Sequence, residues 1–350
     1  MAIRIGSEAN LHLDPRELAA TLQPLERATM LPPAAFADPA VLDWEMENVF
    51  AGWVCCGHAS SVSEPGSYLM RELGRSRVFV IGGEAGEPRA FLNACRHHDE
   101  VRSAVVGGLI LVDPSGEAPD PVEHVGELAD LLELYRLSSL LRAEAKTYEV
   151  DANWKAIAEN YNECLHCPGV HPELNALSDY RSGQTRDGPG AWCGGSMRLN
   201  EGAEMMGRGH GKASSRPPIQ GLPPEELDAV YYFALFPNAL VSLHPDYVML
   251  HTLWPRATDR TAVVCEWYFE PATIARTDFD PRDAVEFWDQ VNREDWRVCE
   301  LTQKGVRTRG YVAGRYSAQE NDVHAFDSMV ARSYLNAVNE RGQRGEEAVG

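Results

Sequence analysis

The sequence has 350 residues, and its 52 acidic residues against 32 basic ones give a formal net charge of −20. This charge argues against nucleic acid and anionic membranes as partners, and no apolar run approaches the roughly 20 residues that a bilayer span needs. The first residues lack the apolar stretch of a secretory signal. We therefore expect a cytoplasmic protein whose eight cysteines are free thiols or metal ligands rather than a disulfide framework.

The first half of the chain is predicted to pass from an irregular lead into short β strands. Residues 1–45 favour short helices and loops. β segments separated by Gly and Pro follow from about Trp53 to Asn93, and another covers residues 103–116. Residues 117–145 are acidic and Leu-rich, which predicts helix, and a strong helix starts near Asn153 after an extended segment.

The second half combines apolar strands with one long helix. A stretch rich in Gly, Pro and Ser at residues 201–225 predicts a loop. Apolar runs between about Val230 and Pro271 predict strands, and a helix from about Pro281 to Lys304 has Asp280 as its N-cap and Gly305 as its stop. The fold class expected is α+β, with a small β-rich unit over residues 1–112 and a unit over residues 113–350 in which helices flank an antiparallel sheet.

The helix near Asn153 carries the strongest chemical signal. At about 100° per residue, an apolar face contains Trp154, Ile157, Tyr161, Cys164 and Leu165, whereas the opposite face contains Glu159, Glu163 and His166. A solvated polar face is the ordinary explanation of such a pattern. The sequence alone does not exclude it.

His166 is followed five residues later by His171, a spacing that no straight helix places on one side. Pro168 and Gly169 lie between them and can break the helix, which would bring the two imidazoles together. Two imidazoles and one carboxylate form the facial triad that suits ferrous iron. Structural zinc at Cys164 and Cys167 is an alternative, but Cys164 falls on the apolar face of a continuous helix and is expected to be a core thiol.

The third ligand is sought among the carboxylates of the long helix near residue 290. Its apolar stripe runs through Val285, Trp288, Val291 and Cys299, and Asp295 falls in the middle of that stripe. The other candidates lie off it, namely Asp289, Glu294 and Glu300. A carboxylate on a buried stripe is costly unless it is paired or binds a metal, so Asp295 is the candidate, with a hydrogen-bonded buried Asp as the plain alternative.

These residues resemble the iron-binding signature of the large (alpha) subunits of Rieske-type non-haem iron oxygenases. The resemblance is carried by Asn153-Trp154-Lys155, Glu159-Asn160, Glu163, His166, His171 and Pro172. It implies that His166 and His171 bind Fe(II), that Asp295, five residues before Glu300, is the third ligand, and that Glu163 and Asn160 act at the site, with Glu163 bridging toward the electron donor. Glu163 with Cys164, and Cys167 after His166, are most similar to the choline monooxygenase and glycine betaine oxygenase branch, although Leu165 stands where that branch usually has Tyr.

The family's second cofactor, a Rieske 2Fe-2S cluster, needs two Cys and two His ligands. Cys95 and His97 resemble the first Cys-x-His pair. The second, Cys-x-x-His pair is absent, because no Cys occurs between Cys95 and Cys164. Dozens of residues are therefore expected to be missing near Glu100 and Val101, and Cys95 and His97 are expected to be remnant ligands without a cluster.

Aromatic residues of the predicted sheet are candidates for the cavity wall. Trp254, Trp267, Tyr268 and Phe233 could hold a quaternary ammonium group by cation–π attraction, or they are ordinary core residues. His251, in a strand, is a candidate for facing the pocket, although a single histidine is more often structural.

The resemblance implies a reduced Rieske-like β domain followed by a helix-grip catalytic domain with an antiparallel sheet. It implies O2-dependent hydroxylation and N-demethylation of a quaternary ammonium compound such as a betaine, with NAD(P)H acting through a reductase or ferredoxin partner and with a homotrimer as the assembly. Two alternatives stay open: an aromatic-ring hydroxylating dioxygenase alpha subunit, and a non-catalytic relic that binds iron or a ligand.

Overall fold

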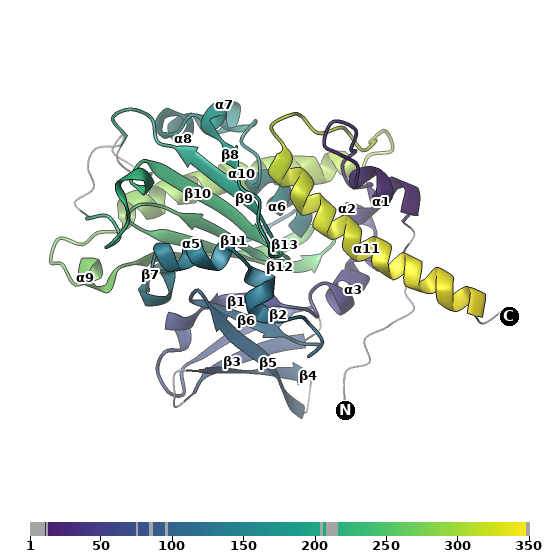
Figure 1. The fold of residues 1–350 in the computed structure, drawn as a ribbon, viewed down its shortest axis with the longest axis horizontal. Helices are drawn as coiled ribbons and strands as arrows, with labels where there is room; N and C mark the ends of the chain where they lie inside the picture. The colour runs from purple at the N-terminus through teal and green to yellow at the C-terminus, as the bar shows by residue number, and fades with distance from the viewer. Residues whose placement is uncertain are drawn as a thin grey trace.

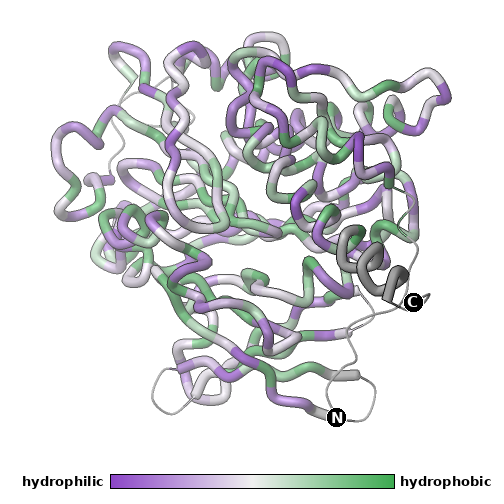
Figure 2. The backbone as a smooth tube through the Cα atoms, turned by 45° about the vertical axis from the view of Figure 1, so that its right-hand side comes forward, coloured by the Kyte–Doolittle hydropathy of each residue, from purple (hydrophilic) through white to green (hydrophobic). Residues whose placement is uncertain are grey.

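The computed structural model describes residues 11, 13–74, 76–83, 87–94, 97–203, 206–207 and 216–347. Two antiparallel sheets lie one above the other, and helices cover the outer face of the larger sheet (Figure 1). Hydrophobic residues gather along the strands in the interior, as Figure 2 shows. Among the described helices, none combines the length and the apolar character that a membrane span requires.

Three short helices form the N-terminal lead, and two of them start where an Asp–Pro pair sets the backbone. Asp14 and Asp38 each accept a hydrogen bond from a backbone N–H in the first turn, and each is followed by a Pro that fits the first helical position. The helices are α1 (Pro15–Thr21), α2 (Ala34–Ala37) and α3 (Pro39–Asn48). α1 packs against the C-terminal helix of the chain.

The first sheet has six strands in the order β1-β6-β5-β4-β3-β2. Its strands are β1 (Val54–His58), β2 (Tyr68–Leu73), β3 (Ser76–Gly82), β4 (Pro88–Ala94), β5 (His97–Val106) and β6 (Leu109–Asp113), with a 3-10 turn, η1 (Ala59–Val62), after β1. Every residue of β1 and β6 is buried, because these strands lie between the rest of this sheet and the second unit.

Strands β4 and β5 are neighbours, with Ala94 opposite His97. β5 then continues without interruption to Val106 and pairs with β6. The position near Glu100 and Val101, where residues were expected to be missing, lies inside this continuous strand. The sheet is therefore regular at this position.

The second sheet has seven strands in the order β7-β13-β12-β11-β10-β9-β8. Its strands are β7 (Leu141–Val150), β8 (Gln184–Thr185), β9 (Trp192–Arg198), β10 (Ala229–Leu235), β11 (Ala239–Leu243), β12 (Val248–Ala257) and β13 (Arg260–Phe269). Side chains alternate between its two faces. Along β12, Val248 and Leu250 pack toward the first sheet, whereas Met249 and Leu253 pack in the core on the helical side.

The helices divide between the two faces of this sheet. Short elements between the sheets or in loops are α4 (Pro121–Val125), α5 (Leu128–Leu134), η2 (Leu137–Ser139), η3 (Tyr180–Ser182), η4 (Pro224–Glu226) and α9 (Pro271–Ile274). The site-bearing side has α6 (Trp154–Tyr161), α7 (Cys167–Val170), α8 (Pro172–Leu177), α10 (Arg282–Val306) and α11 (Asn321–Glu347). The segment predicted as helix at 117–145 thus splits into two short helices, and its end belongs to β7. The long helix α10 starts after Pro281 rather than Asp280 and passes Gly305 by one residue.

Candidate metal centre

The helix that carries the signature is shorter than its pattern predicted. α6 begins after Asn153, whose side chain accepts a hydrogen bond from the N–H of Lys155, and it ends at Tyr161. Asn162 then closes the last turn, because its side-chain amide donates to the carbonyl oxygen of Ala158 (2.7 Å). Glu163 and His166 therefore lie on the following segment, and the prediction that they share a helical face with Glu159 is wrong. Glu159 is buried next to α11 instead.

His166 and His171 are the two flanking residues of the four-residue helix α7. Pro168 lies in the first turn of α7, where a proline does not remove a helical hydrogen bond. Pro168 and Gly169 therefore lie inside a helix and do not break it, contrary to the prediction. The break comes at His171, which precedes Pro172 and adopts φ −120° and ψ 69°, outside the helical region. A residue before proline is restricted in this way. This turn brings the Nε2 atoms of the two imidazoles to 3.1 Å from each other.

Asp295 reaches the same point from α10. Its Oδ1 lies 3.1 Å from Nε2 of His166 and 2.8 Å from Nε2 of His171. Asp289 and Glu300, the more distant candidates on this helix, are not part of this group, and Asp289 pairs with Lys146. Three donor atoms from two segments 120 residues apart thus converge on one point.

The spacing of these atoms fits one metal ion. Ligand atoms roughly 2.1 Å from an ion and at right angles to one another lie about 3.0 Å apart, whereas a tetrahedral ion would hold them about 3.4 Å apart. The three observed separations, 3.1, 3.1 and 2.8 Å, are short enough for one ion to contact all three atoms. Two imidazoles and one carboxylate would suit ferrous iron and would leave it able to bind other ligands.

Two further carboxylates orient the imidazoles. The Nδ1–H of His166 donates to Oε1 of Glu163 (2.5 Å), and the Nδ1–H of His171 donates to Oε2 of Glu294 (2.8 Å). Each bond fixes the tautomer that leaves the Nε2 lone pair for a metal. Glu294 was set aside in the sequence because it lies off the apolar stripe. The signal that could have found it is its position directly beside Asp295.

The electrostatics of the group favour a cation. Burial alone would lower the pKa of His166, but its bonds to Asp295 and Glu163 outweigh burial and raise that pKa to about 10. Burial would raise the pKa of Asp295, yet its contacts with both imidazoles lower it. In the absence of a metal the carboxylates therefore hold protons on the imidazoles, and a divalent ion would take the place of those protons.

Asn160 and the two nearby cysteines complete the loop. The Nδ2 of Asn160 lies 3.5 and 3.4 Å from the two ring nitrogens of His166, so this residue contacts the ligand without a short bond. Cys164 and Cys167 form a disulfide. The prediction of a core thiol at Cys164, and the zinc alternative, are therefore wrong, because the helix ends before Cys164 and the loop brings the two sulfur atoms together.

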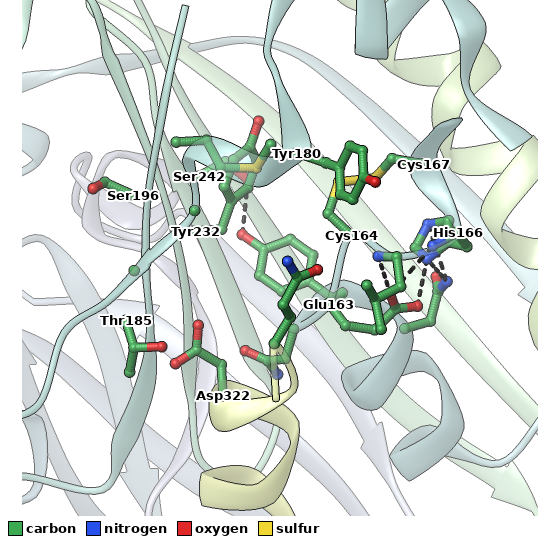
Figure 3. Close-up of a pocket in the computed structure, with 18 of the residues that line it drawn as sticks. Glu163, Cys164, His166, Cys167, Tyr180, Thr185, Ser196, Tyr232, Ser242 and Asp322 are labelled. Atoms are coloured by element: carbon green, nitrogen blue, oxygen red, sulfur yellow. Dashed lines mark hydrogen bonds and ion pairs between the residues drawn. A yellow bond between two sulfur atoms is a disulfide. The ribbon is translucent and has the colours of Figure 1, made fainter. Parts of the chain in front are cut away.

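A cavity of about 610 Å³ opens on this group (Figure 3). Its aromatic walls come from Tyr161, Tyr180, Tyr232, Trp288 and Trp296. His251 lines it as well, with its Nε2 3.2 Å from the side-chain oxygen of Asn292.

The aromatic residues that were candidates for this wall lie in the core instead. Trp254, Trp267, Tyr268 and Phe233 are at most 1% exposed and are not among the lining residues. The alternation along strands did not reveal which face would meet a cavity; the four are ordinary core residues, the second of the two interpretations, and do not form the cavity wall.

The expected cluster ligands do not form a second site among the described residues. Cys95 lies outside the described residues, and His97 is the first residue of β5. The sequence has no second Cys-x-x-His pair to complete a 2Fe-2S site. The residues of this chain therefore fit a mononuclear metal and do not fit the cluster.

Comparison with known proteins gives one family. The model of the ring-hydroxylating alpha subunit catalytic domain matches residues 137–336. The chain is 22% identical to the glycine betaine monooxygenase oxygenase subunit of Pseudomonas aeruginosa, over 85% of this chain and 86% of that one. It is 23% identical to the chloroplastic choline monooxygenase of Arabidopsis thaliana, over 88% and 83%. A crystal structure of the quaternary ammonium Rieske monooxygenase CntA superposes with a TM-score of 0.74 at 18% identity, over 92% of this chain and 98% of that one.

The alignment with the Pseudomonas protein spans 373 positions but uses 85% of this 350-residue chain, or about 298 residues. About 75 aligned positions therefore hold no residue of this chain.

Proposed function

The chain belongs to the family of ring-hydroxylating oxygenase alpha subunits, which are iron-dependent oxygenases, and from this premise we propose that it hydroxylates and so demethylates a quaternary ammonium compound with O2. The observation that carries the proposal is the convergence of His166, His171 and Asp295 at the floor of a cavity with aromatic walls. A quaternary ammonium group has no hydrogen to donate. Aromatic faces that attract it through their quadrupoles suit it best.

In this proposal, His166, His171 and Asp295 hold ferrous iron. Iron there supplies the activation of O2 for insertion of one oxygen atom into an N-methyl group, after which formaldehyde leaves the demethylated amine. Glu163 and Glu294 keep the Nδ1 protons on the imidazoles, and the aromatic walls exclude water and would hold the N-methyl group near His166, His171 and Asp295. Glu163, bonded to His166, is also the residue through which electrons would approach.

Electron supply separates this chain from a complete family member. The proposal assigns NAD(P)H as the source, through a reductase or ferredoxin partner, and a homotrimer as the assembly. No step is assigned to a 2Fe-2S cluster, because Cys95 and His97 alone cannot hold one. This deficit favours a second candidate function, a relic that binds iron or an ammonium ligand without turning it over.

Metal content tests the site. Protein purified without oxygen and loaded with ferrous iron is expected to bind about one iron per chain. His166→Ala and Asp295→Asn are expected to weaken iron binding at least about tenfold, because each removes a ligand. Glu300→Gln, on the same helix and outside the group, is the matched control. Equal iron in all four proteins would contradict the site, as would zinc in preference to iron.

Formaldehyde release tests the reaction. With a reductase, NADH and O2, the loaded protein is expected to release formaldehyde from a trimethylammonium compound and to leave naphthalene unchanged. Iron binding without formaldehyde under every electron source would support the relic. Dihydroxylated naphthalene in its place would assign the aromatic-ring chemistry.

A further inference from the structure

The cavity has a second functional end, away from the metal group. Figure 3 places Thr185 and Asp322 on the opposite side of the cavity from His166. Thr185 belongs to β8, and Asp322 lies in the first turn of α11. Asp187 lines the cavity at the same end.

Acidic side chains outnumber Lys and Arg side chains among the described residues that line this cavity. Its described lining residues include four carboxylates, from Glu163, Asp187, Asp295 and Asp322, and one guanidinium, from Arg181. Glu163 and Asp295 are bonded to the imidazoles. The guanidinium of Arg181 is paired with Asp179 (2.9 Å), and its side chain is 70% exposed. The end away from the metal thus has two acids and, among the described lining residues, no unpaired Lys or Arg.

Asp322 is not explained by its place at the start of α11. Its Oδ1 is buried and has no hydrogen-bond partner among the described residues, so that oxygen caps nothing. Burial, together with the charge of Asp187, raises the pKa of Asp322 to about 6, and a hydrogen bond with Thr185 opposes this shift. The carboxylate is therefore mostly ionised at neutral pH, and no Lys or Arg of the described residues forms an ion pair with it. A buried anion of this kind is costly until a donor or a cation binds it.

Two further polar residues of the described wall, His251 and Tyr232, add no positive charge that would favour an anion. His251 is only 3% exposed and its Nδ1 has no partner. Burial lowers the pKa of His251 to about 4, so its ring is neutral. The hydroxyl of Tyr232 is buried and also unpartnered. These groups can accept or donate single hydrogen bonds, but none can neutralise a carboxylate.

We propose that Asp322, supported by Asp187 and Thr185, selects methylated ammonium substrates whose tail ends in a hydrogen-bond donor and carries no carboxylate. The inference rests on the proposed function. In that function the N-methyl group that reacts lies at the metal, so the rest of the substrate extends toward Asp322. A hydroxyl tail donates to the free Oδ1 of Asp322. A carboxylate tail brings a second anion against Asp322 and Asp187 and finds no counter-charge.

Choline and glycine betaine test this directly, because they share the trimethylammonium group and differ in a hydroxymethyl against a carboxylate. Isothermal titration of the iron-loaded protein is expected to give choline at least about tenfold tighter binding than glycine betaine. In Asp322→Asn this preference is expected to shrink to about threefold or less, because the amide neither repels a carboxylate nor requires a donor. Asp278→Asn removes an equal charge from the surface and is the matched control, expected to keep the wild-type ratio.

A second variant guards against a folding defect. If Asp322→Asn unfolds, as its thermal midpoint would show, Asp187→Asn is expected to shift the preference in the same direction. Equal affinity for the two ligands in the wild type, no binding of either, or an unchanged ratio in the folded variant overturns the proposal. Failure of the oxygenase proposal gives a different result. Selective binding of choline without release of formaldehyde would contradict the oxygenase proposal and leave the selection by Asp322 intact. Release of formaldehyde from glycine betaine in preference to choline would contradict the selection by Asp322 and leave the oxygenase proposal intact.

Discussion

Asp295 and Glu294 are neighbours in α10, but the sequence predicts only one of them. Asp295 could be selected because a charge on a buried helical stripe requires an explanation. The apolar stripe does not select Glu294, because an acid off that stripe is ordinary, and the turn at His171 brings the Nδ1 of that imidazole to 2.8 Å from it. The prediction for Cys164 was wrong for a related reason. It assumed that the helix continues to Cys164, whereas α6 ends at Tyr161.

The role of Glu294 gives a prediction for one bond. Glu294→Gln retains the size of the side chain but replaces a charged acceptor with a neutral one, so the tautomer and the basicity of His171 are held less firmly. We expect iron affinity to fall by about tenfold, within the range seen for such supporting groups. The measurement is iron retention against a graded series of chelator concentrations, with Glu300→Gln as the control. Retention equal to that of the wild type would show that the Glu294 contact does not support the ligand.

At the scale of elements, a buried ionic network joins α3, α6 and α11. Lys155 in α6 pairs with Glu45 in α3 (2.6 Å), and both side chains are fully buried. Glu159 in α6 and Asp327 in α11 lie in the same region, and burial together with their mutual repulsion raises the pKa of Glu159 well above its ordinary value. Three acids beside one base in this interior do not all ionise readily, so the pair of Glu159 and Asp327 still binds a proton near neutral pH.

This network predicts a loss of stability as the pH rises. Burial raises the pKa of Asp327 to about 7. An unfolded Asp has already lost its proton near its ordinary pKa of about 4, so the folded state binds more protons between the two values. Stability therefore falls as the pH rises from about 4 through 7, and this contribution is fully lost above the folded pKa. Asp327→Asn cannot ionise, while its amide oxygen can still accept from the hydroxyl of Tyr316, which donates to Asp327 at 2.6 Å.

From pH 6 to pH 8, the wild type is therefore expected to lose about 1 kcal/mol of its free energy of unfolding through this group, and Asp327→Asn is expected not to show that loss. Urea unfolding at the two pH values provides the measurement. Asp278→Asn is the control, because Arg276 lowers the pKa of Asp278 and its charge is constant in this window. Parallel pH profiles for all three proteins would rule out a shared proton in the network.

At the scale of the whole molecule, much of the fold could be predicted and the cavity could not. The α+β class, with a β-rich unit before helices on an antiparallel sheet, is confirmed by the structure and by its superposition on family members. Strand periodicity and the signature around His166 are local patterns, so a single sequence is enough to predict them. The cavity depends on how α10, α11 and β8 pack together, and no local sequence pattern predicts that packing. For this reason Asp322 and the aromatic wall were missed.

The absence of a second Cys-x-x-His pair from the sequence gives a prediction for the metal and sulfide content of the protein. Iron-loaded protein is expected to contain about one iron per chain and no acid-labile sulfide, because the ligands of a 2Fe-2S cluster are incomplete. Iron and sulfide assays on the same sample, with a complete family member as the positive control, would measure both. About three irons and two sulfides per chain would mean that Cys95 and His97 find partners from another source.

The disulfide between Cys164 and Cys167 has a consequence for how the metal enters. It closes a small ring around Leu165 and His166, next to the bond between Glu163 and His166. Ordering a free loop on binding costs conformational entropy, and a cross-link removes part of that freedom beforehand. His166 is thus held in place before iron arrives. The affinity of this centre would then depend on the thiol chemistry of its surroundings as well as on its ligands.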